Sequence, residues 1–275
     1  MPDVHSHGAS IPALGLGTWQ LTGADARRMV ERALELGYRH IDTAEAYDNH
    51  AAVGRAIDAA DVPRSQVFLT TKIWPDHFDP DGFRAAVADA LAALRTDHVD
   101  LLLLHWPRFE RASLERTIEL LNEARTGGRT RHIGVSNFTK DLLARAEEHS
   151  AAPIVVNQVE YHPFLDQTPV LEAVRERGTA LTAYSPLARG RAVNEPVLQA
   201  IGERHGKSAA QVALRWLVQQ DGVAAVPKSS SSDHASENLD VFDFELSPEE
   251  TRRISELADP DGRVIDSAGL APDWD

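Results

Sequence analysis

A chain of 275 residues is long enough for one α/β barrel or two small domains, and its formal charge of −14 excludes broad binding to nucleic acid or anionic membranes. Hydrophobic residues make up 43% of the chain, but no apolar run approaches the roughly 18 residues that a membrane-spanning helix needs. Without cysteine, disulfides and thiolate metal sites are excluded, and the polar first residues lack the apolar core of a signal peptide. We therefore expect a soluble, cytoplasmic protein.

Short apolar runs alternate with longer helix-like segments along nearly the whole chain, which is the pattern of repeated βα units. Runs such as Leu101–Leu104 are apolar throughout, as expected of parallel strands that are covered on both faces. In chain order, the eight predicted strands are Ala13–Gly17, Tyr38–Asp42, Val67–Ile73, Val99–His105, His132–Ser136, Ile154–Glu160, Ala180–Tyr184 and Ala224–Pro227.

Helical periodicity, often with Ser, Thr or Asp before it and Gly after it, marks the segments between these strands. In chain order, the predicted helices are Ala24–Leu36, Ala51–Ala60, Asp79–Leu94, Ser113–Thr126, Thr139–His149, Thr168–Glu176 and Ser208–Gln220. This alternation predicts a closed (β/α)8 barrel, with an open doubly wound sheet as the alternative. We expect one domain over residues 1–275, a small cap or frayed segment up to Ile11, and an irregular tail from Asp259.

Four polar residues lie at or near the carboxyl ends of three successive predicted strands. Asp42 ends the second strand with Tyr47 just after it, Lys72 is near the end of the third, and His105 ends the fourth. Because the carboxyl ends of barrel strands meet on one face, these side chains should lie together. Lys72 stands in an apolar segment and needs a charged partner, for which Asp42 is the candidate.

Each of these residues also has an ordinary structural interpretation. Asp42 could cap the next helix, Tyr47 could be a half-buried packing aromatic, and His105 could be a core histidine. The 12 histidines are scattered without an HExxH motif, so we expect no metal site. The segment Gly15–Gln20 begins like a dinucleotide-binding glycine fingerprint, but Gln20 stands where the last glycine belongs.

These residues and their surroundings resemble the aldo-keto reductase family, and among its bacterial members the chain is similar to 2,5-diketo-D-gluconate reductases. The order and spacing match from about residue 11 to residue 250. The matching segments are Gly15–Trp19, His40–Ala44, Tyr47, Lys72, Leu103–Pro107, Ile133–Phe138, Asn157–Glu160, Ala183–Leu187 and Val226–Ser229.

The resemblance implies a (β/α)8 barrel that reduces aldehydes or ketones with a nicotinamide cofactor. Hydride transfer to a carbonyl carbon creates an alkoxide that must be protonated. Tyr47 would be the proton donor, Lys72 would lower the pKa of its phenol, and Asp42 would orient Lys72. His105, expected to be neutral, would bind the carbonyl oxygen.

The resemblance also implies a cofactor site for NADP(H). Ser136, Asn137 and Gln158 would bind the carboxamide, Tyr184 would stack on the nicotinamide ring, and the loop after it would cover the pyrophosphate. The full set is Gly17, Thr18, Trp19, Asp42, Ser136, Asn137, Gln158, Tyr184, Ser185, Pro186, Leu187, Gly190, Lys228, Ser229, Ser230, His234, Glu237 and Asn238. Ser136–Asn137 could instead be only a turn, and Tyr184 only barrel packing.

One position departs from the family pattern. His234 stands where an arginine usually completes the clamp on the 2′-phosphate, and an imidazole grips phosphate less well than a guanidinium. We therefore expect a weaker preference for NADPH and some use of NAD(H), unless His234 or a nearby serine compensates.

For the substrate we expect a small carbonyl compound in an aromatic pocket formed by Trp19, Tyr47, Trp74, His105 and Trp106. The tryptophans could equally be rim packing. The short C-terminal segment predicts an open cleft, and we expect a monomer. Two other functions remain as alternatives: a nicotinamide-sensing regulatory protein with little turnover, and an unrelated barrel enzyme such as a metal-dependent hydrolase.

Overall fold

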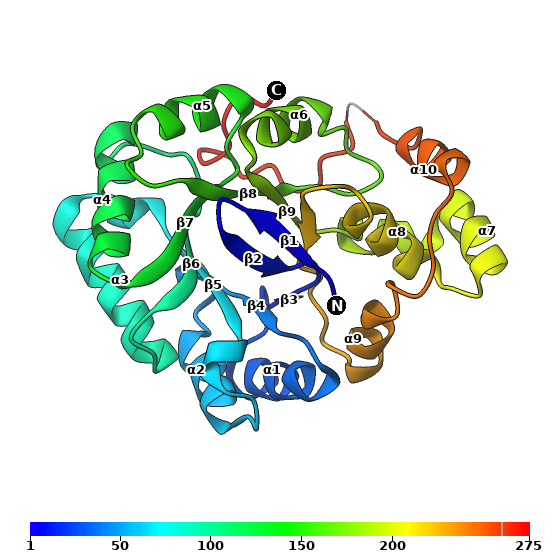
Figure 1. The fold of residues 1–275 in the computed structure, drawn as a ribbon, viewed down its shortest axis with the longest axis horizontal. Coiled ribbons are helices and arrows are strands. Elements are labelled where there is room, and N and C mark those ends of the chain that lie inside the picture. Colours follow the sequence, from blue (N-terminus) through cyan, green and yellow to red (C-terminus); the bar gives the residue numbers. More distant parts are fainter. Residues whose placement is uncertain (260) are drawn as a thin grey trace.

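The computed structural model describes residues 1–259 and 261–275. Eight parallel strands form one sheet in the order β10-β9-β8-β7-β6-β5-β4-β3. Two further parallel bridges, Leu14 with Ala225 and Gly17 with Lys228, join the two ends of this sheet. The sheet therefore closes into the predicted (β/α)8 barrel with helices around it (Figure 1), which excludes the open doubly wound alternative.

The eight predicted strands are all present, and the shortest lie where the sheet closes. Ile154–Glu160 and Ala180–Tyr184 were predicted with the bounds that the structure has, whereas the first and last strands are shorter than predicted. The strands are β3 (Leu16–Gly17), β4 (His40–Asp42), β5 (Phe68–Ile73), β6 (Val99–Leu104), β7 (Thr130–Ser136), β8 (Ile154–Glu160), β9 (Ala180–Tyr184) and β10 (Val223–Ala225).

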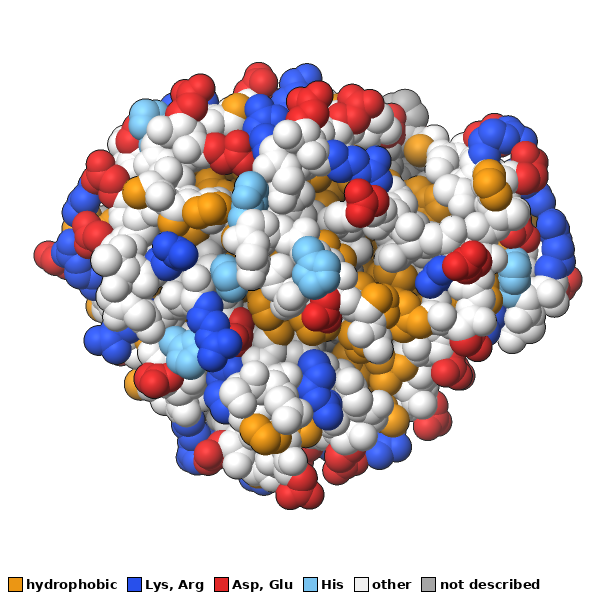
Figure 2. Space-filling model, in the orientation of Figure 1, with side chains coloured by type: hydrophobic (Ala, Val, Ile, Leu, Met, Phe, Trp, Pro, Cys, Tyr) orange, Lys and Arg blue, Asp and Glu red, His pale blue; other side chains and the backbone are white. Residues whose placement is uncertain are grey.

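The polar N-terminus forms the small cap that was one of its two predicted states. Strands β1 (Asp3–Ser6) and β2 (Ala9–Pro12) pair antiparallel and lie across one end of the barrel (Figure 1). Ile11 belongs to a buried cluster with Phe68 and Ala180, which begin their own strands. The hairpin therefore closes the amino-terminal end of the barrel. On this face apolar side chains gather toward the centre and charged ones toward the edge (Figure 2).

The seven predicted helices are present, with ends that differ by one or two residues. Ser113, Thr139 and Ser208, predicted as first residues, instead precede their helices, and each side chain accepts a hydrogen bond from a backbone N–H of the first turn. The helices are α1 (Gly23–Leu36), α2 (His50–Ala59), α3 (Pro80–Leu94), α4 (Leu114–Thr126), α5 (Lys140–Glu148), α6 (Thr168–Arg177) and α8 (Ala209–Val218).

Three further helices and several 3-10 turns were not predicted. Helix α9 buries only Ala235 and Asn238 and helix α10 only Glu250 and Ile254, so neither has an apolar stripe that periodicity could detect. The unpredicted elements are α7 (Pro196–His205), α9 (Ser232–Leu239), α10 (Pro248–Ser255), η1 (Glu45–Tyr47), η2 (Arg64–Gln66), η3 (Pro75–His77) and η4 (Ala188–Asn194).

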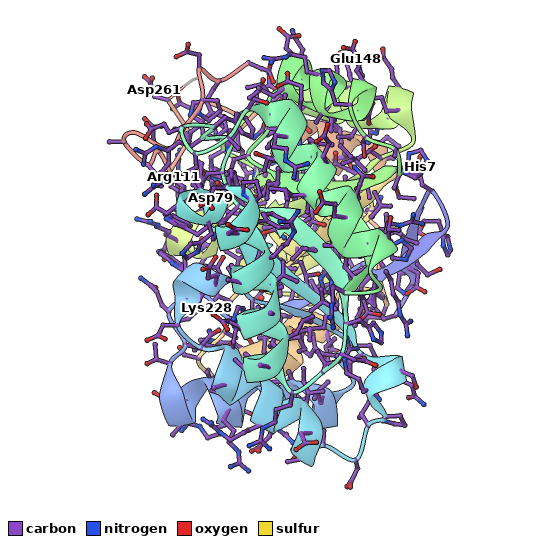
Figure 3. All side chains as sticks on the ribbon, turned by 90° about the vertical axis from the view of Figure 1, so that its left-hand side faces the viewer. His7, Asp79, Arg111, Glu148, Lys228 and Asp261 are labelled. Carbon is purple, nitrogen blue, oxygen red and sulfur yellow. The ribbon has the colours of Figure 1, made fainter. Side chains whose placement is uncertain are left out.

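The carboxyl-terminal end of the barrel lies opposite the hairpin. In Figure 3, Lys228 and Asp261 lie on this side of the molecule and His7 of the hairpin turn on the other. The tail from Asp259 is irregular as predicted, except that residue 260 lies outside the described residues. Within the described residues, no helix is long and apolar enough to cross a membrane, and no group of three or more His, Asp or Glu side chains could hold a metal ion.

Candidate active site

Lys72 is the centre of the polar cluster at the open end of the barrel. Its side chain is 1% exposed, and its Nζ lies 2.5 Å from Asp42 Oδ1, 3.0 Å from the carbonyl oxygen of Thr43 and 3.5 Å from Tyr47 Oη. An ammonium has three protons to donate, and these three oxygens can accept all of them. The predicted partnership of Lys72 with Asp42 is therefore present, and it extends to the phenol.

Asp42 holds this ammonium rather than capping a helix. Its second carboxylate oxygen accepts a hydrogen bond from Gln158 Nε2 at 2.7 Å. The next two helices begin after Ala44 and Asn49, whose side chains form no capping hydrogen bond. The capping interpretation of Asp42 is therefore wrong, because both of its oxygens face inward to buried donors.

The electrostatics of Tyr47 differ from our expectation. Burial of the hydroxyl, together with the nearby charge of Asp42, raises the pKa of Tyr47 well above its ordinary value. The net shift is opposite in direction to the one that the resemblance implied, because desolvation of the phenolate and the charge of Asp42 both raise the pKa. Lys72 is itself affected by burial, which lowers its pKa against the opposing charge of Asp42. The phenol therefore keeps its proton across the neutral pH range.

His105 lies beside Tyr47 in an aromatic wall. Its ring is 5.7 Å from the Tyr47 ring and 5.1 Å from the Trp74 ring, edge to face in both cases. Burial and the charge of Lys72 hold the pKa of His105 well below its ordinary value, so the ring is neutral, as expected. Nδ1 is buried without a hydrogen-bond partner among the described residues. Such an atom costs free energy unless a ligand or water satisfies it.

A chain of amide hydrogen bonds connects His105 with the next strands. Asn137 Nδ2 donates to the carbonyl oxygen of His105 at 2.9 Å, and its Oδ1 accepts from Tyr184 Oη at 2.7 Å. Ser136 Oγ donates to the carbonyl oxygen of Gln158 at 2.8 Å. Asn137 has a φ of 65°, in the left-handed region that Asn tolerates better than most residues. Ser136 thus ends β7, and Asn137 begins the bend after it, from which its amide lines the cavity.

A cavity of about 340 Å³ opens above this cluster. The five residues predicted for the substrate pocket all line it, with Trp19 the most exposed at 39%. Of the residues predicted to bind cofactor, those that line the cavity are Gly17, Trp19, Asp42, Ser136, Asn137, Gln158, Tyr184, Ser185 and Lys228. The arrangement joins a buried phenol and a neutral imidazole with a row of amide and hydroxyl groups on one wall.

The other residues predicted to bind cofactor do not line this cavity. Thr18 is buried and donates to the carbonyl oxygen of Asp42 at 3.0 Å. Ser229 is buried and donates to the carbonyl oxygen of Ser231, and His234 is exposed on α9. The rest lie in the segment after β9 or between β10 and the end of α9; they are Pro186, Leu187, Gly190, Ser230, Glu237 and Asn238. Their assignment to a cofactor stays a prediction.

Several cavity residues were missed from the sequence. They are Ala46, Arg189, Val226, Ile265 and Ser267. Arg189 lies next to the predicted Gly190, and its guanidinium carbon is 5.5 Å from the Trp19 ring, so the neighbouring motif was a usable signal. Ile265 and Ser267 belong to the irregular tail, where no periodicity or motif pointed to the site.

Comparison with known proteins agrees with this geometry. A sequence model of the aldo/keto reductase family matches residues 13–259. The chain is 40% identical to methylglyoxal reductase DkgB of Escherichia coli O157:H7, over 97% of this chain and 100% of that protein.

Two solved structures extend the comparison. One, provisionally designated 2,5-diketo-D-gluconic acid reductase B, is 51% identical, has a TM-score of 0.98, and is matched over 100% of this chain and 98% of its own. The other is a Bombyx mori aldo-keto reductase in complex with NADP, which is 33% identical with a TM-score of 0.89, over 96% of this chain and 95% of its own.

Proposed function

The chain belongs to the aldo/keto reductase family, and on that premise we propose that it reduces small aldehydes and ketones to alcohols with NADPH or NADH, using Tyr47 as the proton donor. The observation that carries the proposal is the triple contact of Lys72 Nζ with Asp42, Thr43 and Tyr47 at the base of a cavity. A single buried ammonium thereby connects the proposed proton donor to a compensating carboxylate.

The residues present fit a nicotinamide dinucleotide. Lys228 lines the cavity, is exposed, and has no ion-pair partner among the described residues, so its ammonium is available to a phosphate. The side-chain oxygen of Gln158 faces no donor within the described part of the chain, while its Nε2 is held by Asp42, so the oxygen can accept from a carboxamide. Arg189 adds a second cation to the rim. When bound, the reduced nicotinamide supplies the hydride that attacks the carbonyl carbon.

Tyr47 and Lys72 manage the proton in this proposal. As the carbonyl carbon gains a hydride, its oxygen becomes basic and takes the phenol proton from Tyr47, which gives the alcohol. Lys72 Nζ, 3.5 Å from the phenol oxygen, stabilises the phenolate that remains until solvent returns a proton. The raised pKa of Tyr47 keeps the phenol protonated before each turnover.

His105 and the aromatic wall orient the substrate. A neutral imidazole can donate one ring N–H to the carbonyl oxygen without competing for the proton of Tyr47. Trp74 packs edge to face on that ring and restricts its rotation. The residues proposed to hold the cofactor line the same cavity, and the name of the Escherichia coli relative, a methylglyoxal reductase, favours small carbonyl compounds as substrates.

The proposal includes a monomeric enzyme, because all four proposed catalytic residues come from one chain, and it keeps the single domain and the cytoplasmic location expected from the sequence. Light scattering of the purified protein tests the monomer. The experiment that tests the function follows the loss of NADPH and NADH absorbance over a panel of aldehydes, ketones and keto-sugars. We expect turnover with small aldehydes; failure to oxidise either cofactor with any member of the panel, despite cofactor binding, would favour the sensing role instead.

A further inference from the structure

The C-terminal tail forms part of the cavity wall. Ile265 and Ser267 line the cavity, and Asp261 lies on the same side of the molecule as Lys228 in Figure 3. The tail ends beside α5 (Figure 1), where the Asp275 carboxylate accepts a hydrogen bond from the backbone N–H of Lys140 at 2.9 Å. A segment of irregular backbone is thus held across the open end of the barrel, although its described residues form no helix or strand.

A buried carboxylate beneath the tail explains how it is held. Glu160, the last residue of β8, is 0% exposed. One of its oxygens accepts from the backbone N–H of Val264 at 2.6 Å, and the other from that of Ile265 at 2.9 Å. Alternate residues of a strand share a face, so Glu160 lies on the same side of β8 as Gln158, which binds Asp42. The end of β8 therefore carries both Gln158, whose amide lines the cavity, and Glu160, which binds the tail.

His162 completes the environment of this carboxylate. Its Nδ1 accepts from the backbone N–H of Phe164 at 3.3 Å, so the ring proton is on Nε2, which lies 2.9 Å from Glu160 Oε1. Nε2 is therefore the donor to this carboxylate. Glu160 accordingly accepts from two backbone N–H groups and one imidazole, and a guanidinium nitrogen of Arg263 lies 3.9 Å away. Each of these four groups is a donor or a cation.

We propose that Glu160 is a positioning residue that seats the C-terminal tail and thereby sets the substrate-facing wall formed by Ile265 and Ser267. Glu160 does not itself line the cavity, so it acts through the backbone of Val264 and Ile265. The role in substrate selection rests on the proposed carbonyl reduction, whereas the seating of the tail does not.

Other contacts of the tail lie next to the residues that Glu160 binds. The guanidinium of Arg263 stacks 3.6 Å from the Trp274 ring, and that ring lies 6.4 Å from the ring of Trp106 in the cavity wall. Gly262 is buried against Phe164, and an added Cβ would collide with the carbonyl oxygen of Phe164. Two independent features therefore fix this segment: the Glu160 carboxylate binds the backbone of Val264 and Ile265, and Gly262, without a Cβ, packs closely against Phe164.

Replacing Glu160 by Gln should release the segment. An amide has one acceptor atom and one donor atom, so one of the two backbone N–H groups would face another N–H instead of an oxygen. A buried donor that loses its acceptor carries the full cost of desolvation. Gly262→Ala should release the same segment by collision, without touching the carboxylate. Glu147→Gln is a matched control, because Glu147 pairs with Arg177 and Thr179 near the hairpin end of the barrel.

Limited proteolysis with trypsin measures the seating without any activity. The bond after Arg263 is a trypsin site, and the guanidinium is shielded by Trp274, with its side chain 15% exposed. We expect cleavage at this bond to be at least about tenfold faster in Glu160→Gln and Gly262→Ala, since cleavage tracks the opened population. The mass of the 264–275 fragment identifies the cleaved bond. The Glu147→Gln variant should match the wild type. Unchanged cleavage in both tail variants would overturn the proposal.

Steady-state kinetics then separates positioning from general destabilisation. Methylglyoxal and phenylglyoxal share the reacting dicarbonyl but differ in bulk, so only the second should reach the tail wall. We expect both tail variants to raise the KM for phenylglyoxal by about tenfold, the factor that 1.4 kcal/mol of lost contact gives, with kcat and the KM for methylglyoxal little changed. An equal loss with both substrates would mean a merely structural role and refute positioning. If the wild type reduces neither compound, the function fails while the proteolysis result still decides the seating.

Discussion

Removal of the Lys72 ammonium is the perturbation that the structure describes most completely. In Lys72→Met, a side chain of similar length loses the charge that binds Asp42 Oδ1, the Thr43 carbonyl oxygen and Tyr47 Oη. Asp42, whose side chain is 3% exposed, would keep Gln158 as its only side-chain donor within the described part of the chain. The variant therefore leaves a buried carboxylate without a compensating cation.

Two separate losses follow from this geometry. Breaking a buried ion pair by removing one partner costs about 3–5 kcal/mol of the free energy of unfolding. Loss of the donor that stabilises the Tyr47 phenolate should lower kcat by roughly 10²–10³-fold, the usual effect of removing one such group. The double variant Lys72→Met/Asp42→Asn removes both charges, so it should regain most of the stability and none of the turnover.

Urea unfolding and NADPH oxidation measure the two losses separately. Lys207→Met is a suitable control, because Lys207 forms an ion pair with Asp243 whose carboxylate is exposed. We expect the control to shift the unfolding midpoint much less and to leave kcat unchanged. The reasoning is refuted if Lys72→Met is as stable as the control, or if the double variant recovers turnover together with stability.

Two further predictions concern histidines. Burial and the charge of Lys72 lower the pKa of His50 to about 4, so the unfolded chain binds a proton that the folded chain excludes between about pH 4 and 6.5. The stability that this residue contributes is therefore present above pH 6.5 and is lost as the pH falls. In His50→Gln, the slope of the unfolding free energy against pH over this window should drop by up to about 1.4 kcal/mol per pH unit. An unchanged slope in urea titrations would contradict the assignment. In the wild type, the ratio of kcat/KM for NADPH over NADH should stay below about a thousandfold, worth roughly 4 kcal/mol, and His234→Arg should raise it; a higher wild-type ratio, or no rise in the variant, counts against a phosphate site near His234.

The barrel was predictable because its strands carry a strong local signal. Leu101–Leu104 is apolar throughout, which indicates a strand covered on both faces, and short strand-like runs alternate with helical segments along nearly the whole chain. Helices α9 and α10 bury too few apolar side chains to produce a periodic signal, so they were missed. Tertiary contacts, rather than local pattern, set those helices.

The proposed catalytic cluster was predictable from strand ends, but its energetics were not. The positions of Lys72 and Asp42 at or near strand ends were enough to predict that they form an ion pair. They could not say that Asp42 binds Gln158 instead of capping a helix, or that burial and the charge of Asp42 raise the pKa of Tyr47. Both depend on which groups surround an atom in three dimensions.

The tail was the largest gap in the sequence-based expectation. A short C-terminal segment predicted an open cleft, yet Ile265 lines the cavity because Glu160, which lies 105 residues earlier in the chain, binds its backbone N–H. No local signal in the tail reveals an acceptor so distant in sequence. The sequence therefore did not reveal that the tail contributes to the cavity wall.

The turnover of Tyr47→Phe tests the central claim most directly, because this change removes one oxygen atom and little else. We predict that kcat with NADPH and methylglyoxal falls by about 10²–10⁴-fold, the usual contribution of a positioned proton donor, while the Kd for NADPH, measured by tryptophan fluorescence, stays within about twofold. Unchanged turnover in Tyr47→Phe would contradict the account.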